Sequence, residues 1–263
     1  MKEQASYVYG FALESFDIGE YKGIDEKNNV YLEDCGGMCA VTSKVDLDEF
    51  AHPYIDENLG NLNWLKIKAE RHMDVIKKAM EYTQIIPLKF CTVFYNDSNI
   101  KQFAQEHKKQ LIENLSKLQG KEEWSCKIYW DKKEFMSNHM REEKEKIKGD
   151  SSNISKGAAY FMKKKLENSL NEQAICKVNL IIERIIDTLK DLVLESKVNK
   201  ILAKEITGRN QDMVMNSSLL IDCREKELFL EKMKELNSKV EDYGLIFEYS
   251  GPWPLYNFIE NLE

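Results

Sequence analysis

Apolar residues recur with strand-like or helix-like spacing along nearly the whole chain. Between residues 6 and 13, aromatic and aliphatic side chains occupy both sets of alternating positions, which predicts a strand covered on both faces. A Gly36-Gly37 turn signal separates two further β-rich segments. In the first half of the chain we therefore predict strands over 6–13, 30–33, 39–45 and 88–95, and helices over 48–57, over 63–82 and from Asp97 or Ser98 to Leu118.

The second half of the chain has a more regular pattern. Alternation over 124–130 predicts a strand with one apolar face. A long predicted helix over 155–190 carries a continuous apolar seam made of Ala174, Val178, Ile181, Ile185 and Leu189. The remaining predicted elements are a charged helix over 132–148, a flexible break over 149–153, strands over 192–199, 213–222 and 245–249, and a helix over 223–241.

The order of these elements predicts the fold class. Residues 123–250 run strand, helix, strand, strand, helix, strand, which is the ferredoxin-like βαββαβ order, and the charged helix is an insertion in the first crossover or an extension of it. The first half has a related but irregular order. We therefore predict an α+β protein of two domains: a modified α+β domain over 1–120, and a ferredoxin-like domain over 121–263 that carries the long helix and ends in a Gly-Pro-Trp-Pro tail.

Composition and charge narrow the class of protein. In the 263 residues, 43% are hydrophobic and 10% aromatic, which is enough for a globular core. The net charge is −7, and Lys163–Lys165 falls in a helical pattern where we expect a solvated face, so no nucleic-acid partner is predicted. Residues 1–17 do not resemble a secretion signal, and no apolar run is long enough to span a membrane. We therefore expect a cytoplasmic protein whose six cysteines are free thiols.

No residue pattern indicates catalysis. Cys35 and Cys39 have only His52 nearby, and a structural zinc ion needs four ligands, so we interpret this segment as a turn between strands. His72 lies on the apolar face of its predicted helix, where we expect a packed and hydrogen-bonded core residue. Phosphate-binding loops and nucleophile elbows are absent from the sequence. We therefore predict no catalytic, cofactor-binding or metal-binding residue, and no enzyme activity.

The closing segment Gly251-Pro252-Trp253-Pro254 is unusual. Its prolines fix φ and remove two backbone donors, so the preceding strand must end in a stiff corner that aims Trp253, Tyr256 and Phe258 in defined directions. Two interpretations follow: a structural lid on the core, or an aromatic docking patch for a partner. The physical chemistry of the residues favours the lid.

Four segments together resemble the gas vesicle proteins of the GvpF/GvpL type. They are Tyr7–Gly10, the stretch from His72 to Phe94, Gly157–Phe161, and the closing Gly251–Phe258, which is the most specific of the four. Two departures from the family pattern stand out. Leu255 stands where a further proline is common, and Cys91 stands where a glycine or alanine is usual.

The resemblance implies a role in building gas vesicles, as an F-like or L-like member. It implies a non-enzymatic assembly protein or minor structural component, located in the cytoplasm and at the gas vesicle, that binds the hydrophobic shell protein and other accessory vesicle proteins. It also implies a modified ferredoxin-like N-terminal domain. The candidate partner-binding residues are Tyr7, Tyr9, Trp253, Tyr256 and Phe258. The alternative is a ferredoxin-like ligand-binding regulatory module or small enzyme, with a pocket near Cys35, Cys39 and His72.

Overall fold

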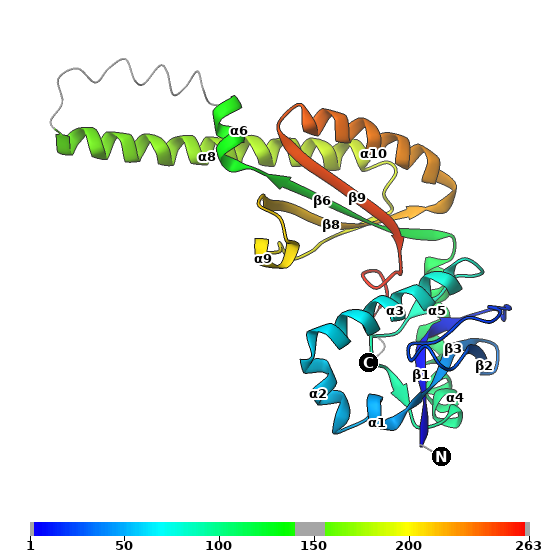
Figure 1. Ribbon diagram of the computed structural model, residues 1–263. Helices are drawn as coiled ribbons and strands as arrows, with labels where there is room; N and C mark the ends of the chain where they lie inside the picture. The colour runs from blue at the N-terminus through cyan, green and yellow to red at the C-terminus, as the bar shows by residue number, and fades with distance from the viewer. Residues whose placement is uncertain (1–2, 140–155, 261–263) are drawn as a thin grey trace. The chain divides into compact units, whose positions relative to one another are not determined.

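A computed structural model of the chain describes residues 3–139 and 156–260. The chain forms two compact units, each with its own antiparallel sheet and helices (Figure 1). The first unit contains Met1–Glu122 and Pro252–Glu263, and the second contains Glu123–Gly251. The predicted mixture of helices and strands is confirmed. The closing residues, however, pack in the first unit, whereas the sequence analysis assigned them to the C-terminal domain over 121–263.

The first unit is built around its central strand. Strand β1 (Gln4–Ala12) lies between β3 (Cys39–Asp46) and β4 (Ile86–Pro87), β2 (Val30–Asp34) extends the sheet beyond β3, and β5 (Val93–Phe94) also pairs with β1. From Ala5 to Ala12 every residue of β1 is buried, which confirms the predicted strand covered on both faces. Its register with β3 shifts between Val8 and Gly10.

The predicted strand over 88–95 is formed only at its end. Strand β5 lies within this range, β4 precedes it, and the segment between the two strands is irregular. Leu88 donates its backbone N–H to Tyr9, Thr92 donates to Lys89, and Cys91 has a positive φ of 64°. Tertiary hydrogen bonds therefore bend this segment into a turn, although its residues alternate as a strand would. The left-handed φ at Cys91 is one that a glycine adopts without strain.

In the part of the first unit that the structure describes there are five helices: α1 (Leu47–Phe50), α2 (Tyr54–Gly60), α3 (Leu62–Met80), α4 (Asp97–Glu106) and α5 (Lys108–Leu118). Two predicted helices are each divided. The one over 48–57 breaks before Pro53, because a residue preceding proline disfavours helical geometry. The one ending at Leu118 is interrupted at His107 and is capped by the side chain of Asn96, not by Asp97 or Ser98.

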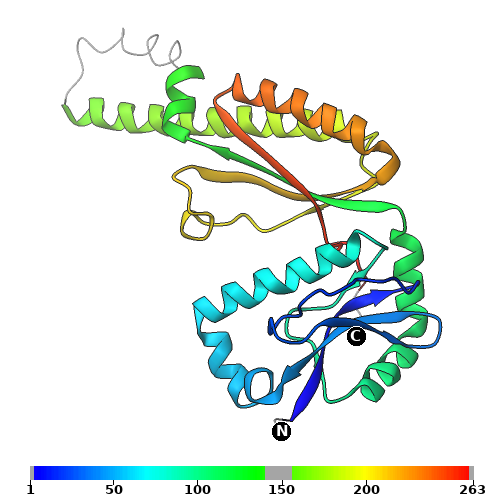
Figure 2. The same cartoon turned by 45° about the vertical axis from the view of Figure 1, so that its right-hand side comes forward.

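The second unit has the strand order β7 (Glu195–Val198), β8 (Asp212–Asp222), β6 (Lys121–Trp130), β9 (Leu245–Trp253). Helices α8 (Lys156–Leu189) and α10 (Lys226–Glu241) lie on one face of this sheet (Figures 1 and 2). Shorter elements are α6 (Lys132–His139), α9 (Lys204–Thr207) and the 3-10 turn η1 (Cys223–Glu225). The predicted helix continuation over 140–148 and break over 149–153 lie outside the described residues.

The core of the second unit follows the predicted seam. All five seam residues of α8 are buried against alternate residues of β6 and β8 and against the inner face of α10. Trp124, Cys126, Ile128 and Trp130 point into this core, as the alternation predicted. Among the described residues, no helix is both long and apolar enough to cross a membrane.

We predict that Gly10→Ala destabilises the first unit by about 1–3 kcal/mol. A Cβ at this position would overlap the Ile86 carbonyl oxygen and lie 2.7 Å from Ile85 Cγ2, where packing leaves no room. The matched control is Gly60→Ala, because a Cβ at Gly60 meets nothing within 4 Å. Urea unfolding should show a clear loss for the first variant and none for the second. Equal stabilities would show that β1 tolerates the added methyl group.

Candidate partner-binding site

The closing segment forms a lid on the first unit. Leu255 and Phe258 are each 1% exposed, and Pro254 is buried with them. Asn114 Oδ1 accepts the backbone N–H of Glu260 at 2.9 Å, which ties the end of the segment to α5. Trp253 is only half-buried, with Lys77 Nζ 4.3 Å from the centre of its ring. The lid is therefore made by Leu255 and Phe258 more than by Trp253.

His72 lies at the centre of the same core. It projects from α3 and is 2% exposed. Its ring packs against the rings of Tyr7, Tyr9 and Phe90, with centroids 5.6 to 5.7 Å apart. This confirms the interpretation of His72 as a packed core residue.

Two tyrosine hydroxyls contact the two ring nitrogens of His72. Tyr7 Oη lies 3.0 Å from Nδ1, and Tyr256 Oη lies 2.8 Å from Nε2. Tyr256 donates its hydroxyl hydrogen to the Leu88 carbonyl at 2.9 Å, so its oxygen accepts from Nε2–H. Nδ1 then accepts from Tyr7, whose oxygen accepts the Cys91 backbone N–H at 2.8 Å. Every donor and acceptor in this series of hydrogen bonds has a partner when the imidazole of His72 is neutral and protonated on Nε2.

Burial determines whether His72, Tyr7 and Tyr256 carry a charge. Burial lowers the pKa of His72 to about 4, and the Leu88 backbone carbonyl opposes this effect. Burial also raises the pKa of Tyr7 and of Tyr256 above the ordinary value. All three groups are therefore neutral near pH 7. Because both imidazole nitrogens are already bonded, His72 is not placed to exchange protons with a substrate from solvent.

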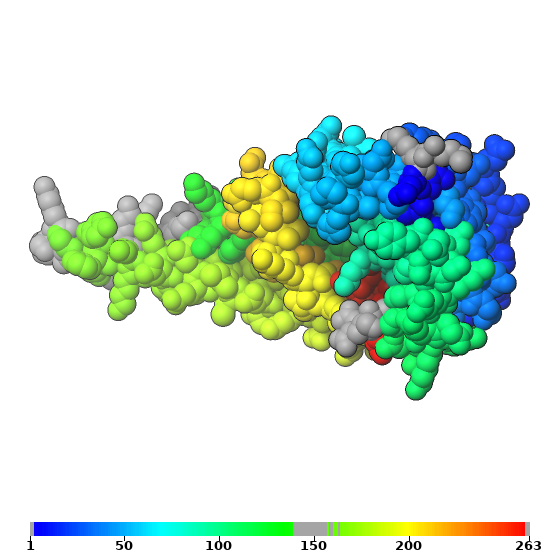
Figure 3. All heavy atoms as spheres, turned by 90° about the horizontal axis from the view of Figure 1, so that it is seen from below, coloured from blue at the N-terminus to red at the C-terminus, as the bar shows by residue number. Residues whose placement is uncertain are grey.

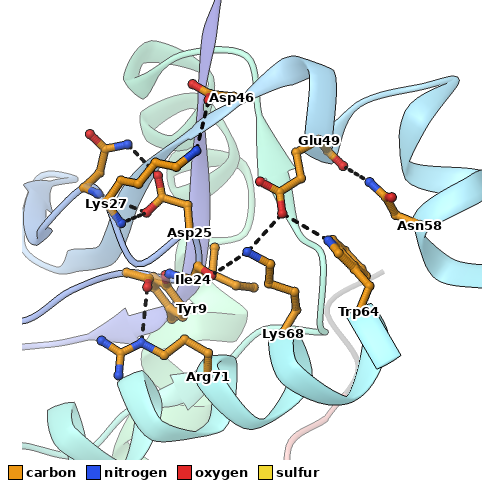
Figure 4. Close-up of polar contacts among 12 residues, drawn as sticks. Tyr9, Ile24, Asp25, Lys27, Asp46, Glu49, Asn58, Trp64, Lys68 and Arg71 are labelled. Atoms are coloured by element: carbon orange, nitrogen blue, oxygen red, sulfur yellow. Dashed lines mark hydrogen bonds and ion pairs between the residues drawn. The ribbon is translucent and has the colours of Figure 1, made fainter. Parts of the chain in front are cut away.

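A second polar cluster holds α1, α2 and α3 together (Figure 4). Glu49 Oε1 lies 2.9 Å from Lys68 Nζ and accepts the Trp64 indole N–H at 3.0 Å. Lys68 also donates to the Ile24 carbonyl at 3.1 Å, and Asn58 donates to the Glu49 carbonyl at 2.9 Å. These contacts fix α1 and α2 against α3.

The hydroxyl of Tyr9 anchors the loop that precedes β2. It accepts the Ile24 backbone N–H at 2.7 Å and lies 2.9 Å from Ser43 Oγ. Arg71 holds the same loop by donating to the Gly23 carbonyl at 3.2 Å and to the Lys22 carbonyl. Tyr9 therefore has a structural role inside the unit.

An open groove of about 770 Å³ lies beside α1 and α2. Figure 3 looks onto the end of the first unit that carries these two helices. The apolar part of the groove is formed by Leu47, Phe50, Ile55, Leu59 and Val93, with Ala51 and Cys91 beside them, and two exposed tyrosines, Tyr54 and Tyr95, flank it. Among the described residues of its lining, the acidic ones are Glu3, Asp48 and Asp56, and His52 Nδ1 lies 2.9 Å from Asp56 Oδ2. The described groove thus combines apolar and aromatic surface with acidic residues at its rim.

The sequence-predicted contact residues have different environments. Tyr7, Tyr9 and Phe258, which the sequence placed among the contact residues, are buried in the first unit and have almost no surface to offer a partner. Tyr7 is buried where its hydroxyl bonds to His72, Tyr9 where its hydroxyl bonds to the loop before β2, and Phe258 within the lid. Trp253 is half-buried and Tyr256 is 37% exposed, and for these two, partner contact stays a prediction.

The alternative site near Cys35, Cys39 and His72 is not brought together as a reactive cluster. Cys35 and Cys39 flank a turn, in which Cys35 N–H donates to the Met38 carbonyl, as predicted. Burial raises the pKa of both thiols, to about 11 for Cys39, so neither is an activated nucleophile. No group of His, Cys, Asp and Glu residues in the described chain has the arrangement of a metal site.

The groove residues were missed by the sequence analysis. They come from the N-terminus, α1, α2 and the segment around β5. No helical or strand periodicity in the sequence links these segments. One signal was present in the sequence. Between residues 46 and 59, apolar and acidic residues are mixed without lysine or arginine, and the exposed apolar residues Tyr54 and Leu59 fall in this stretch.

Comparisons with known proteins agree with one another. The sequence profile of the family described as "Gas vesicle synthesis protein GvpL/GvpF" matches residues 5–260. The chain is 23% identical over 229 residues to gas vesicle protein L of a Streptomyces species, covering 85% of this chain and 80% of that protein. It is 26% identical over 180 residues to gas vesicle protein F of a Nostoc species, covering 65% and 68%.

The fold is also similar to a solved structure. The crystal structure of the gas vesicle protein GvpF from Anabaena matches with a TM-score of 0.72 and 21% identity, over 99% of this chain and 98% of that one. A likeness at this identity shows that the two proteins share their fold.

We predict that Phe258→Ala destabilises the first unit by about 3–5 kcal/mol, because it removes a fully buried ring from the lid. Trp253→Ala should cost less, since the Trp253 side chain keeps contact with solvent. Urea unfolding followed by circular dichroism measures both. A larger loss for Trp253→Ala would show that the half-buried indole is the main lid residue.

We predict that protonation of His72 opposes folding in acid. Its folded pKa of about 4 lies below the unfolded value of about 6.5. The unfolded state therefore binds more protons between these values, and this contribution to stability is complete above pH ~6.5 and is lost as the pH falls toward 4. The loss approaches roughly 3 kcal/mol.

The measurement is urea unfolding at several pH values from 7 to 4. His72→Gln should remove this part of the pH dependence, whatever its effect at pH 7. The wild-type chain, measured over the same pH values, is the reference for this slope. An unaltered slope in the His72 variant would contradict the assignment.

Proposed function

The chain belongs to the GvpL/GvpF family of gas vesicle synthesis proteins, and we propose that it acts in gas vesicle assembly as a binding protein without catalytic activity. Its partners are the hydrophobic shell protein and other accessory vesicle proteins. It works in the cytoplasm and at the gas vesicle. The names of the matched relatives, gas vesicle proteins L and F, support the assembly role.

The groove of the first unit is the observation that carries the binding proposal. It offers apolar surface from Leu47, Leu59 and Val93 in an open hollow, where a partner can approach. A groove of this kind suits an amphipathic helix, whose apolar face fills the hollow. The carboxylates at the rim favour a partner segment that carries lysine or arginine beside its apolar residues.

The chemistry of shell assembly explains why such a groove is useful. A small and very apolar shell subunit exposes surface that aggregates in water before it is incorporated. A partner that covers part of this surface keeps the subunit soluble until the shell accepts it. Moderate affinity is sufficient, because the subunit must leave the groove again.

The absence of catalysis is supported by the state of the reactive side chains. The neutral His72 already uses both nitrogens, and burial raises the pKa of the Cys35 and Cys39 thiols. These are the three residues on which the alternative of a ligand-binding module or small enzyme rested. A flat thermal-shift screen with metals and nucleotides would agree with the binding role.

We also propose that the second unit is ferredoxin-like and the first a modified relative of it. The strand order β7-β8-β6-β9, with α8 and α10 on one face, supports the first assignment. The domain boundary then lies near residue 121, with the closing segment returning to the first unit.

We predict that Leu59→Glu weakens binding to the purified shell subunit about tenfold or more, because it places a charge on the apolar side of the groove. Asp56→Lys should weaken binding too, by reversing one charge of the rim. Biolayer interferometry with immobilised shell subunit measures both.

Two matched controls lie outside the groove lining. Leu62→Glu alters a residue that is 80% exposed, and Glu57→Lys reverses a charge on the same helix as Asp56. Both controls should bind as wild type does. Equal effects in the groove variants and the controls would exclude the groove as the binding site. Loss of vesicles on gene deletion, rescued by wild type but not by Leu59→Glu, tests the role in cells.

A further inference from the structure

Helix α8 is longer than the part of it that packs in the core of the second unit. Among its described side chains, the first buried one is Leu170, and the seam residues follow it. Residues 156–169 precede Leu170 and span about 21 Å of helix. Figures 1 and 2 show this end of α8 extending past the sheet of its own unit. Its described side chains therefore lie outside that core.

This end of α8 exposes three large apolar side chains in a row. Tyr160 is 63% exposed, Phe161 73% and Met162 56%. Exposed apolar surface of this kind marks a site for another protein. Tyr160 and Phe161 also close Gly157–Phe161, one of the four segments on which the resemblance to the GvpF/GvpL type rests. Neither the core of the second unit nor the described lining of the groove includes them, so their exposure points to a further contact.

The same stretch of α8 is basic. Residues 156–169 contain four lysines and one glutamate. Residues three and four positions apart are neighbours on a helix, so the exposed Lys165 adjoins both Phe161 and Met162. We call Phe161, Met162 and Lys165 the α8 tip. The tip thus presents apolar side chains beside a positive charge.

The groove of the first unit has the complementary properties. Its described lining combines apolar residues such as Leu59 and Val93 with the acidic Glu3 and Asp56. A helix that lays apolar side chains into an open apolar groove is a recurrent mode of recognition between proteins. Both surfaces are accessible in the single chain, because Leu59 is 41% exposed and Phe161 is 73% exposed. Each is therefore available to a second copy.

We propose that copies of this chain associate through the α8 tip of one copy and the groove of the next. Phe161 and Met162 enter the apolar part of the groove, and Lys165 lies toward its acidic residues. The inference deepens the proposed function and rests on its groove, because the tip and the shell subunit compete for the same surface. A few turns of helix bury less than about 1,200 Å², the size of a weak and reversible interface. A shell subunit can therefore displace the tip.

The contact joins two different surfaces, and mixing two variants tests this. Phe161→Glu damages the tip and Leu59→Glu damages the groove, so each variant alone should associate about tenfold more weakly or less than that. An equimolar mixture should recover association, because one variant keeps the groove and the other keeps the tip. The mixture should stop at one chain of each kind, whereas wild type can continue into larger assemblies or a ring. Analytical ultracentrifugation of the full chains over a concentration series measures both.

Matched controls lie on the same helix. Leu180→Glu changes a side chain of α8 that is 54% exposed and lies outside the tip, so it should associate as wild type does. Lys165→Glu should weaken association, by placing a carboxylate against an acidic rim. Lys190→Glu reverses an exposed charge beyond the other end of α8 and should have no effect. Circular dichroism should show that all variants fold, since these side chains are not part of the core.

The two proposals that share the groove fail in different ways. Phe161→Glu should still bind the purified shell subunit, because its groove is intact. If Leu59→Glu loses self-association but still binds the shell subunit, the proposed function is contradicted and the contact between copies stands. A chain that sediments as a monomer at all concentrations, whether or not its tip occupies its own groove, would overturn the contact between copies. A mixture of the two variants that fails to recover association would overturn it too.

Discussion

The hydrogen-bond chain through His72 is the interaction on which the first unit depends. It joins α3 to β1 through Tyr7 and to the closing segment through Tyr256. It ends on the backbone at Leu88 and Cys91. A buried imidazole is costly unless both nitrogens are bonded, so these segments must assemble together. The closing segment therefore has to return to the first unit after the second unit has been completed, which makes the first unit discontinuous in sequence.

The same bonds shape the surface. Because Leu88 and Cys91 bond to Tyr256 and Tyr7, the segment between β4 and β5 turns where its residue pattern would continue straight. Cys91, Val93 and Tyr95 consequently lie along the groove, opposite the residues of α1 and α2. The ion pair between Glu49 and Lys68 holds α1, which forms part of the groove, against α3. A neutral, hydrogen-bonded core thus supports an open groove whose described charged residues are acidic.

The sequence predicted those parts of the fold that local periodicity determines. The strand of Tyr7 and Tyr9 and the α8 seam were predictable because each is a run of regularly spaced apolar residues in the sequence. The turn at Cys91 was not predictable, because bonds to residues about eighty positions away outweigh local alternation. An aromatic pattern also does not distinguish a core residue from a contact residue, so Tyr7, Tyr9 and Phe258 were assigned to a partner surface although they are buried. The groove depends on four separate segments, and only the three-dimensional fold brings them together.

The groove combines two kinds of surface that act differently on a partner. Its apolar residues, such as Leu47, Leu59 and Val93, favour the burial of an apolar face. The acidic residues Glu3, Asp48 and Asp56 of its described lining favour a partner of opposite charge. Apolar surface alone would accept any apolar segment, whereas the added charges discriminate against an acidic one. The groove therefore suits a basic amphipathic segment better than an apolar segment without charge.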